Sequence, residues 1–222
     1  MAPFRFSSIA RIATDMENPT IVLASASPRR VDLLQQLGLP FVQILSPVEE
    51  PPPHGTDAET WAILSARAKA QDVTELIHSG RSALDKSAPR IVVGADTVVC
   101  CDGELLGKPI DDEDAARMLR LLSGRDHTVC TGVALLTADG ELSACESTRV
   151  LMAPLSSTAI DAYVDSGEPA GKAGAYAIQG RGGRFVERVE GCYYNVVGLP
   201  LARLCSLLES AGYELDQPQD ME

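Results

Sequence analysis

The stretch TIVLASASPRR, at residues 20–30, contains a strand pattern followed directly by a helix start. Residues 20–24 form a short apolar run with β-branched side chains, which is typical of a buried strand. Small residues interrupt the run, and Pro28 suits the first turn of a helix, where its missing N–H has no partner. Three leucines within residues 33–37 give the helix an apolar stripe, and Gly38 ends it. This pattern predicts a domain that combines a buried sheet with helices.

Alternating strand and helix patterns continue along the rest of the chain. Further strands are expected at residues 41–45, within 90–101, and at 128–137, 142–152, 176–178 and 184–189. Further helices are expected from residue 56 or 57 past residue 68, and at 111–122, 157–165 and 199–211. No repeat is visible, so the sequence predicts a single α/β or mixed α+β domain with a mixed sheet.

The 222-residue chain is acidic, with 31 Asp and Glu against 19 Lys and Arg and a formal net charge of −12. Sequence-independent binding to nucleic acid or to an anionic membrane needs a broad basic surface, so both are disfavoured. No apolar run reaches the roughly 18 residues that a membrane helix needs. A small anionic substrate remains compatible with this charge, because a locally basic site can lie on an acidic protein.

The cysteines indicate the cellular compartment, and the two ends of the chain indicate the limits of the folded domain. No two of the six cysteines have the spacing of a metal knuckle or a redox motif, which predicts free thiols in a reducing compartment, the cytoplasm. Residues 1–19 are expected to be a disordered extension, and residues 212–222 an acidic tail. The folded domain is therefore expected at residues 20–211.

Residues 25–30, between the first strand and the first helix, are a candidate anion site. A helix N-terminus offers free backbone N–H groups, here near Ser27, and the positive end of the helix dipole. Arg29 and Arg30 add forked donors that suit phosphate oxygens. The alternative interpretation is an ordinary helix cap followed by surface arginines.

Asp96 and Lys108 are unusual in their local contexts. Asp96 interrupts an apolar strand, where a carboxylate is costly unless it is paired or binds a metal, so it is a candidate general base or metal ligand. The alternative is a turn aspartate that closes a bulge. Lys108 lies between Gly107 and Pro109, and proline restricts the backbone of the preceding residue. Such a lysine is a candidate phosphate contact.

Two further segments have weaker signals. Glu49 and Glu50 precede a proline run, and paired loop carboxylates can hold Mg²⁺ together with substrate phosphates, although most such pairs are simply solvated. Residues 172–183 are rich in glycine and include Gln179, whose amide can donate and accept when it reads the edge of a base. The alternative there is a glycine-rich turn.

Taken together, these motifs resemble those of the Maf-like nucleotide pyrophosphatases across residues 21–208. The matching segments are LASASPRR at 23–30, GADTVV at 94–99, GKP at 107–109, KAGAYAIQG at 172–180 and YYNVVGLPL at 193–201. The resemblance implies a hydrolase that splits a nucleoside triphosphate into the monophosphate and pyrophosphate. It also implies the fold of inosine-triphosphate pyrophosphatases, a long bent mixed sheet flanked by helices, with two lobes and a central cleft.

The resemblance also implies roles for single residues. Asp96 matches the proton acceptor, and Glu50 with Asp96 would place Mg²⁺ or Mn²⁺. The residues tied to substrate choice are Arg29, Thr97 and Gln179. The further residues that line the cleft are Arg30, Lys69 and Lys108. Glutamine at 179 is typical of the branch that acts on dTTP and UTP, whereas the branch that acts on 7-methyl-GTP has glutamate. The resemblance further implies a homodimer.

Two other functions stay open at this point. One is a nucleotide-binding regulator of cell division without turnover, which would not need Asp96 and Glu50. The other is hydrolysis of 7-methyl-GTP or of modified pyrimidine nucleotides. The departures from the family pattern are modest: Cys100 and Cys101 follow the Asp96 strand, the connection at residues 79–89 is somewhat long, and the N-terminal extension lies outside the domain.

Overall fold

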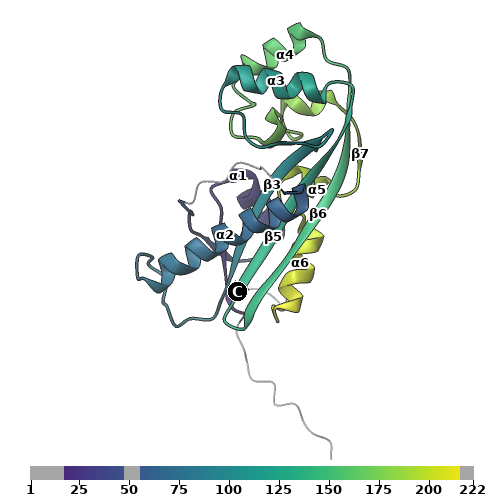
Figure 1. Cartoon of the computed structure of the whole chain (residues 1–222). Coiled ribbons are helices and arrows are strands. Elements are labelled where there is room, and N and C mark those ends of the chain that lie inside the picture. Colours follow the sequence, from purple (N-terminus) through teal and green to yellow (C-terminus); the bar gives the residue numbers. More distant parts are fainter. Residues whose placement is uncertain (1–17, 48–55, 216–222) are drawn as a thin grey trace, which may run out of the picture.

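The computed structural model describes residues 18–47 and 56–215, in which seven strands form one mixed sheet (Figure 1). The strands are β1 (Thr20–Ala24), β2 (Phe41–Gln43), β3 (Arg90–Cys101), β4 (Glu104–Leu106), β5 (Asp126–Thr137), β6 (Gly140–Met152) and β7 (Val186–Glu190). Their order is β2-β1-β3-β5-β6-β7, with β4 paired to β3. β1 is parallel to β2 and β3, and the remaining pairs are antiparallel.

One edge of β3 is left open in the middle of the sheet. β1 pairs with β3 only as far as Gly94, and β4 pairs with β3 only from Val99 onward. Within the described part of the chain, residues 95–98 therefore have no strand on that side, while β5 pairs with them on the other. Asp96 and Thr97 lie in this gap. The predicted strand within residues 90–101 is confirmed, and it connects both ends of the molecule.

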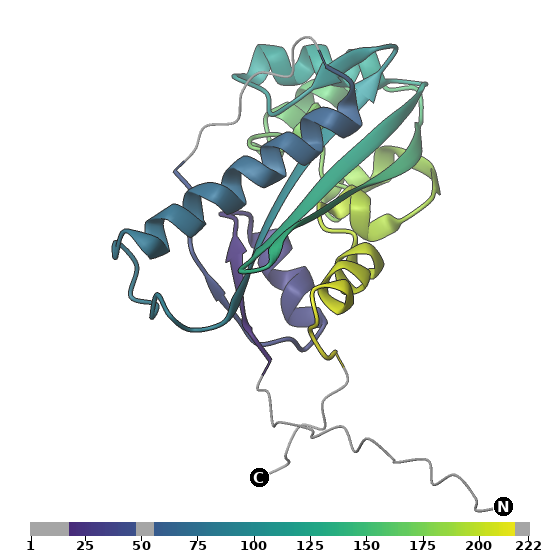
Figure 2. The same ribbon diagram turned by 60° about the horizontal axis from the view of Figure 1, so that its bottom comes forward.

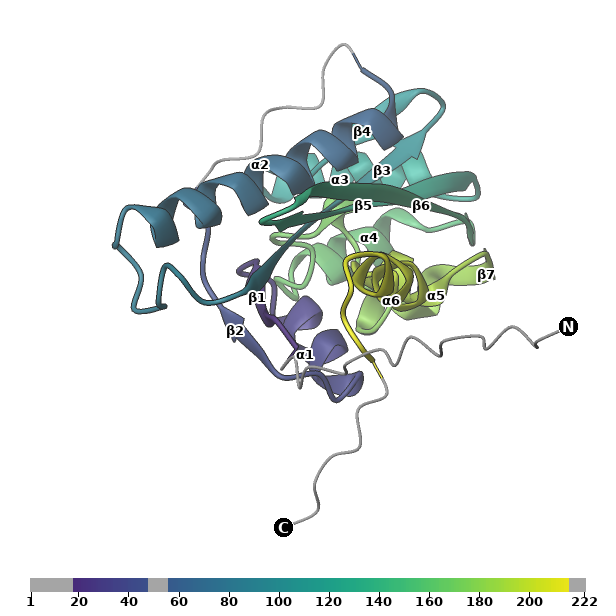
Figure 3. The ribbon, with the colours of Figure 1, turned by 90° about the horizontal axis from the view of Figure 1, so that it is seen from below.

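Helices cover both faces of the sheet (Figure 3). They are α1 (Pro28–Gln36), α2 (Ala58–His78), α3 (Asp112–Leu122), α4 (Ser157–Val164), α5 (Tyr193–Val197) and α6 (Leu201–Ser210), with 3₁₀ turns η1 (Ala173–Ala175) and η2 (Arg181–Phe185). α2 lies on one face, and α1, α5 and α6 lie on the other. None of the helices in the described ranges is long and apolar enough to cross a membrane.

The two largest buried apolar clusters in the described part of the chain lie toward opposite ends of β3, and two smaller clusters lie under α2. One large cluster joins α3 and α4 to the end of β3 that carries Val99 and Cys101. The other large cluster joins α1 and α6 to β1 and to the end of β3 that carries Ile91 and Val93. Between them on the same strand lies Thr97, a polar residue. The chain therefore has two lobes that share a long mixed sheet, which confirms the predicted α/β class.

α2 packs on β3 and β5 (Figure 2). This packing depends on two glycines. A Cβ atom at Gly94 would lie 2.1 Å from the backbone oxygen of Ala66, and one at Gly132 would lie 2.3 Å from the backbone of Ala62. Real Cβ atoms do not approach so closely, so only glycine lets the helix pack at this distance. The close contact brings Lys69, one turn further along α2, next to β3.

Several predicted elements differ from those observed. Residues 176–178 form no strand, because Gly174 and Ala175 have positive φ and turn the chain there. The predicted strand at 184–189 begins only at Val186, after the turn η2. The short helix α5 was not predicted, and the last helix begins at Leu201 rather than at residue 199.

The packed domain extends slightly beyond the expected limits of residues 20–211. The side chain of Asn18 hydrogen-bonds to both the backbone N–H and the backbone carbonyl of Glu214. Tyr213 is buried, with 4% of its surface exposed, in the cluster around α6. The remainder of the expected extension and tail, residues 1–17 and 216–222, lies outside the described residues.

Candidate active site

A cavity of ≈ 420 Å³ opens at the unpaired edge of β3. Its lining includes every predicted site residue that the structure describes, namely Ser27, Arg29, Arg30, Lys69, Asp96, Thr97, Lys108 and Gln179. These residues come from segments far apart in the sequence, and they meet where β1 ends and the two lobes join. Glu50, the predicted metal ligand, lies outside the described residues.

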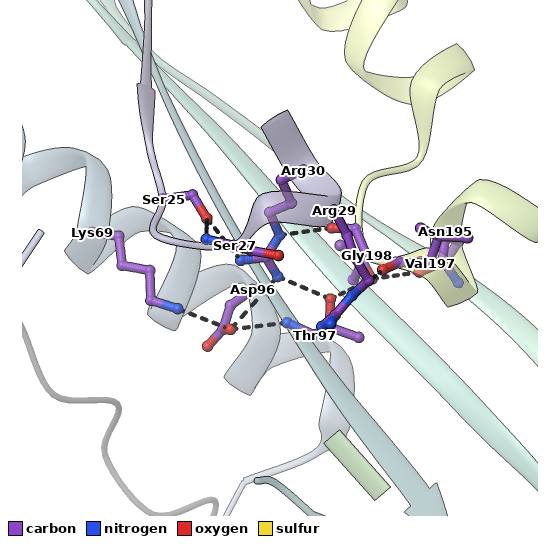
Figure 4. Close-up of polar contacts among 11 residues, drawn as sticks. Ser25, Ser27, Arg29, Arg30, Lys69, Asp96, Thr97, Asn195, Val197 and Gly198 are labelled. Atoms are coloured by element: carbon purple, nitrogen blue, oxygen red, sulfur yellow. Dashed lines mark hydrogen bonds and ion pairs between the residues drawn. The ribbon is translucent and has the colours of Figure 1, made fainter. Parts of the chain in front are cut away.

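Asp96 is 2% exposed and lies at the centre of the site (Figure 4). Its Oδ1 atom accepts a hydrogen bond from Lys69 Nζ at 2.9 Å and another from the backbone N–H of Thr97 at 3.0 Å. The guanidinium of Arg30 lies 3.9 Å away. These contacts offset the cost of burying the carboxylate. Asp96 pairs in register with Gly132, so the alternative of a turn aspartate at a bulge is wrong.

The second carboxylate oxygen of Asp96 has a different environment. Oδ2 is buried, and no described residue hydrogen-bonds to it. A buried carboxylate oxygen without a partner is uncommon in proteins, and it often points to a ligand, an ion or a catalytic role. Oδ1 is therefore held by the protein, whereas Oδ2 is available to a water molecule or a metal.

Arg30 is buried and held in place by contacts on three sides. Its Nε donates to the carbonyl of Gly198 at 2.8 Å, Nη1 donates to Ser25 Oγ at 3.3 Å, and Nη2 donates to Thr97 Oγ1 at 3.0 Å. The interpretation of Arg30 as a surface residue is therefore wrong. Because its side chain is already ordered, little conformational entropy would be lost when it binds an anion.

Positive charge is concentrated in the cavity. Its cations are Arg29, Arg30, Lys69, Lys108 and Lys172, and within the described lining Asp96 is the carboxylate that faces them. Burial lowers the pKa of Arg29, and burial together with the charge of Arg29 lowers the pKa of Lys172. Burial disfavours the charged form of a basic group, as does a neighbouring cation, and an anion that enters the cavity offsets both effects. The cavity thus suits a polyanion.

Thr97 belongs to a row of buried polar groups that crosses the sheet. Its Oγ1 lies 2.9 Å from Thr131 Oγ1, and Thr131 in turn donates to the carbonyl of Asn195 at 3.0 Å. Asn195 then donates to Thr148 Oγ1 at 2.8 Å. We call Arg30 together with these four residues the polar row. It separates the two largest apolar clusters and ends at the cavity.

Adjacent residues of β3 meet different partners because successive side chains of a strand point to opposite faces. Asp96 points to the face covered by α2 and meets Lys69. Thr97 points to the other face and meets Arg30 and Thr131. Thr131 lies outside the motif segments, and Asn195 lies within the segment 193–201 but was given no role there. In the sequence, each of the two residues could have been recognised as a polar side chain within an otherwise apolar strand or helix.

The residues present can be tested for their fit to a divalent metal. No cluster of three His, Cys, Asp or Glu side chains occurs among the described residues. Mg²⁺ usually keeps several water ligands and binds through one or two carboxylates together with substrate phosphates. The free Oδ2 of Asp96, beside a cavity that suits phosphates, fits a metal that binds with the substrate.

Comparisons with known proteins show which proteins this chain is similar to. A dTTP/UTP pyrophosphatase of Pelotomaculum thermopropionicum is 50% identical over 198 residues, which cover 88% of this chain and 98% of that protein. One of Methylobacillus flagellatus is 45% identical over 206 residues, covering 93% of this chain and 100% of that protein. The solved Ham1 protein of Staphylococcus aureus is 14% identical, with a TM-score of 0.45, and covers 86% of this chain and 99% of that chain.

The match to a family model covers most of the folded part of the chain. Residues 20–211 match the model described as Maf-like protein. All five motif segments that resemble this family lie within the matched residues. All five contribute residues to the lining of the cavity. Segment 193–201 does so through Val196, Val197 and Gly198. The chain therefore belongs to the Maf-like protein family.

Proposed function

We propose that this protein is a nucleoside triphosphate pyrophosphatase that hydrolyses dTTP and UTP to the monophosphate and pyrophosphate. The observation that carries the proposal is one buried carboxylate, with a free oxygen, in a cavity lined by five cations. The choice of pyrimidine substrates is supported by the names of the relatives, which are dTTP/UTP pyrophosphatases.

The cations and the start of α1 would hold the triphosphate. Ser27 is the N-cap of α1, and its side chain makes no capping hydrogen bond there. Residues 24–28 line the cavity, which places the positive end of this helix beside it. Arg29, Arg30 and Lys108 would neutralise phosphate oxygens from the surrounding walls.

Asp96 would accept the proton of the attacking water through Oδ2, while Lys69 and the backbone of Thr97 hold Oδ1 in place. Negative charge then develops on the pyrophosphate leaving group, and cations already fixed around it stabilise that charge without reorganisation. A divalent metal, Mg²⁺ or Mn²⁺, would be held by Asp96 and by the predicted ligand Glu50. When bound, it supplies further charge neutralisation at the phosphates.

Gln179 lies at the exposed rim of the cavity, where it would read the edge of the pyrimidine. Its amide offers both a donor and an acceptor.

The presence of Asp96 argues against a regulator that only binds nucleotides, because a carboxylate among the cations weakens anion binding unless it serves the reaction. The six cysteines are free thiols, which supports a cytoplasmic protein. The homodimer stays a prediction.

A panel of nucleotides tests the function directly. With Mg²⁺ or Mn²⁺, the purified protein is expected to release pyrophosphate from dTTP and UTP faster than from CTP, ATP, GTP or 7-methyl-GTP. Chelation with EDTA should stop the reaction, and added metal should restore it. Equal rates across the panel would remove the pyrimidine assignment, and the absence of pyrophosphate release from every nucleotide would refute the enzyme.

Replacing Thr131 by Val is expected to raise the KM for dTTP several-fold and to destabilise the fold by about 1–3 kcal/mol. The change removes a buried hydroxyl from the polar row and leaves Thr97 less able to hold Arg30. Thr131→Ser should restore both properties. Thr74→Val, which removes a hydroxyl bonded to Ala70 on α2, is the control and should keep the wild-type KM. A wild-type KM for Thr131→Val would contradict the role of the row.

A further inference from the structure

Residues 177–183, which we call the glutamine loop, carry Gln179 to the rim of the cavity. Gln179 itself is exposed, so packing around its own side chain does not order it. The chain on both sides of it is nevertheless attached to the end of α4 and the turn that follows. The two side chains responsible are Tyr163 and Glu168.

Both residues hydrogen-bond to the backbone of the glutamine loop. On the N-terminal side of Gln179, the backbone N–H of Ala177 donates to Tyr163 Oη at 3.1 Å. On the C-terminal side, the backbone N–H groups of Arg181 and Gly182 each donate to Glu168, both at 3.0 Å. Tyr163 Oη also donates to Glu168 Oε1 at 2.8 Å, which joins the two anchors into one network.

The glycines of the loop allow these anchors to approach closely. A Cβ atom at Gly180 would lie 2.4 Å from Glu168 Oε1, and one at Gly182 would lie 2.6 Å from Tyr163 Oη. Both contacts are shorter than real Cβ atoms show, so the backbone packs directly on the two polar groups. The glycine-rich pattern of the segment therefore serves attachment as well as turning.

The protonation states of the two anchors suit their contacts. Burial raises the pKa of Tyr163, so its phenol stays protonated and donates. Burial alone would raise the pKa of Glu168, but the hydrogen bonds from the backbone N–H groups of Gly182 and Arg181 lower it. Glu168 is therefore an acceptor at neutral pH, and hydrogen bonds to an ionised acceptor are stronger than those between neutral groups.

We propose that Glu168 and Tyr163 are positioning residues for nucleotide selectivity, because they hold the two flanks of Gln179 at the rim of the cavity. This inference rests on the proposed function, in which Gln179 reads the base. Neither residue lines the cavity. The charge of Glu168 acts on one of the cavity cations, Lys172, whose pKa it raises, so Tyr163→Phe is the variant that leaves the cations unchanged. Loosening the loop is therefore expected to change which base is preferred more than it changes the hydrolytic step.

The test compares Glu168→Gln and Tyr163→Phe with wild type. Glu168→Gln keeps the shape but puts an amide where two N–H groups need acceptors, and Tyr163→Phe removes only the hydroxyl. Each is expected to lower the ratio of kcat/KM for dTTP over that for dCTP by about 5–100-fold, the range set by losing a well-placed polar contact. Asp165→Asn, an exposed acid on the same segment, is the control and should keep the wild-type ratio.

A purely structural role would give a different pattern. It would lower the melting temperature and the fraction of active protein, which reduces the rates with both nucleotides equally and leaves the ratio unchanged. An unchanged ratio in both variants, measured alongside a Gln179→Ala variant that does lower it, would overturn the inference and leave the proposed function intact. An unchanged ratio in Gln179→Ala would overturn the inference together with the role of Gln179 in base reading.

Binding measurements separate the two proposals if turnover is absent. Dissociation constants for dTTP and dCTP, obtained by calorimetry, give a selectivity ratio for binding alone, which does not require hydrolysis. A wild-type protein that prefers dTTP but releases no pyrophosphate would overturn the proposed enzyme alone. The inference about Glu168 and Tyr163 would then stand or fall on the binding ratio of the same variants.

Discussion

Asp96→Asn is expected to lower kcat for pyrophosphate release from dTTP by about 10²–10⁴-fold, the range for loss of a general base. Asparagine keeps the shape of the side chain and can still accept hydrogen bonds from Lys69 and the backbone of Thr97. Its amide group cannot accept a proton from the attacking water, which Oδ2 of Asp96 accepts in the wild type. The loss should therefore appear in kcat measured at saturating nucleotide.

The same variant should bind dTTP without metal at least as tightly as wild type. Asp96 is the described carboxylate among five cations that line the cavity, and removing its charge reduces repulsion of the triphosphate. Calorimetry checks the affinity, and circular dichroism checks that the fold is kept. Asp139→Asn, in the exposed hairpin between β5 and β6, is the control. Near wild-type pyrophosphate release by Asp96→Asn would refute the assigned role.

Gly94→Ala is expected to reduce the free energy of unfolding by about 3 kcal/mol or more, at the upper end of overpacking effects. The new Cβ would lie 2.1 Å from the backbone oxygen of Ala66, and a backbone atom cannot rotate away as a flexible side chain can. Helix α2 must therefore move off the sheet. Urea denaturation monitored by the fluorescence of Trp61 would measure the change.

The displacement of α2 should also affect catalysis, because Lys69 lies one turn beyond Ala66 and donates to Asp96 at 2.9 Å. We expect kcat to fall even in protein that remains folded. Gly107→Ala is the matched control for stability, since a Cβ atom there meets nothing within 4 Å. It should stay within about 0.5 kcal/mol of wild type. Equal stability of the two variants would contradict the proposed packing constraint.

Local patterns in the sequence were enough for most elements and for most of the candidate site. The apolar run at residues 20–24, the proline at the start of α1 and the acidic first turn of α3 act over a few residues, so they are readable without the fold. The motif segments contain seven of the eight described site residues that line the cavity. The eighth, Lys69, lies outside these segments and was indicated by the resemblance to a known family.

Predictions went wrong where contacts distant in sequence decide the local conformation. Residues 176–178 have a strand-like composition, but the N–H of Ala177 bonds to Tyr163 instead of to a neighbouring strand. The helix expected at residues 199–211 begins only at Leu201, and the short helix α5 before Gly198 was not predicted. The carbonyl of Gly198 accepts a hydrogen bond from Arg30. Neither partner is near in sequence, so no local pattern indicates it.

By itself, the sequence determined the class of fold, the family and the set of groups available for chemistry, because these depend on residue types and on their order. Only the tertiary structure decided that β1 ends opposite Gly94 and leaves the edge of β3 open beyond it, so that the cavity forms there. Only it divided the partners of Asp96 and Thr97 between the two faces of the sheet. The reason is that close packing and hydrogen bonding join residues by their distance in space, which short sequence patterns do not record.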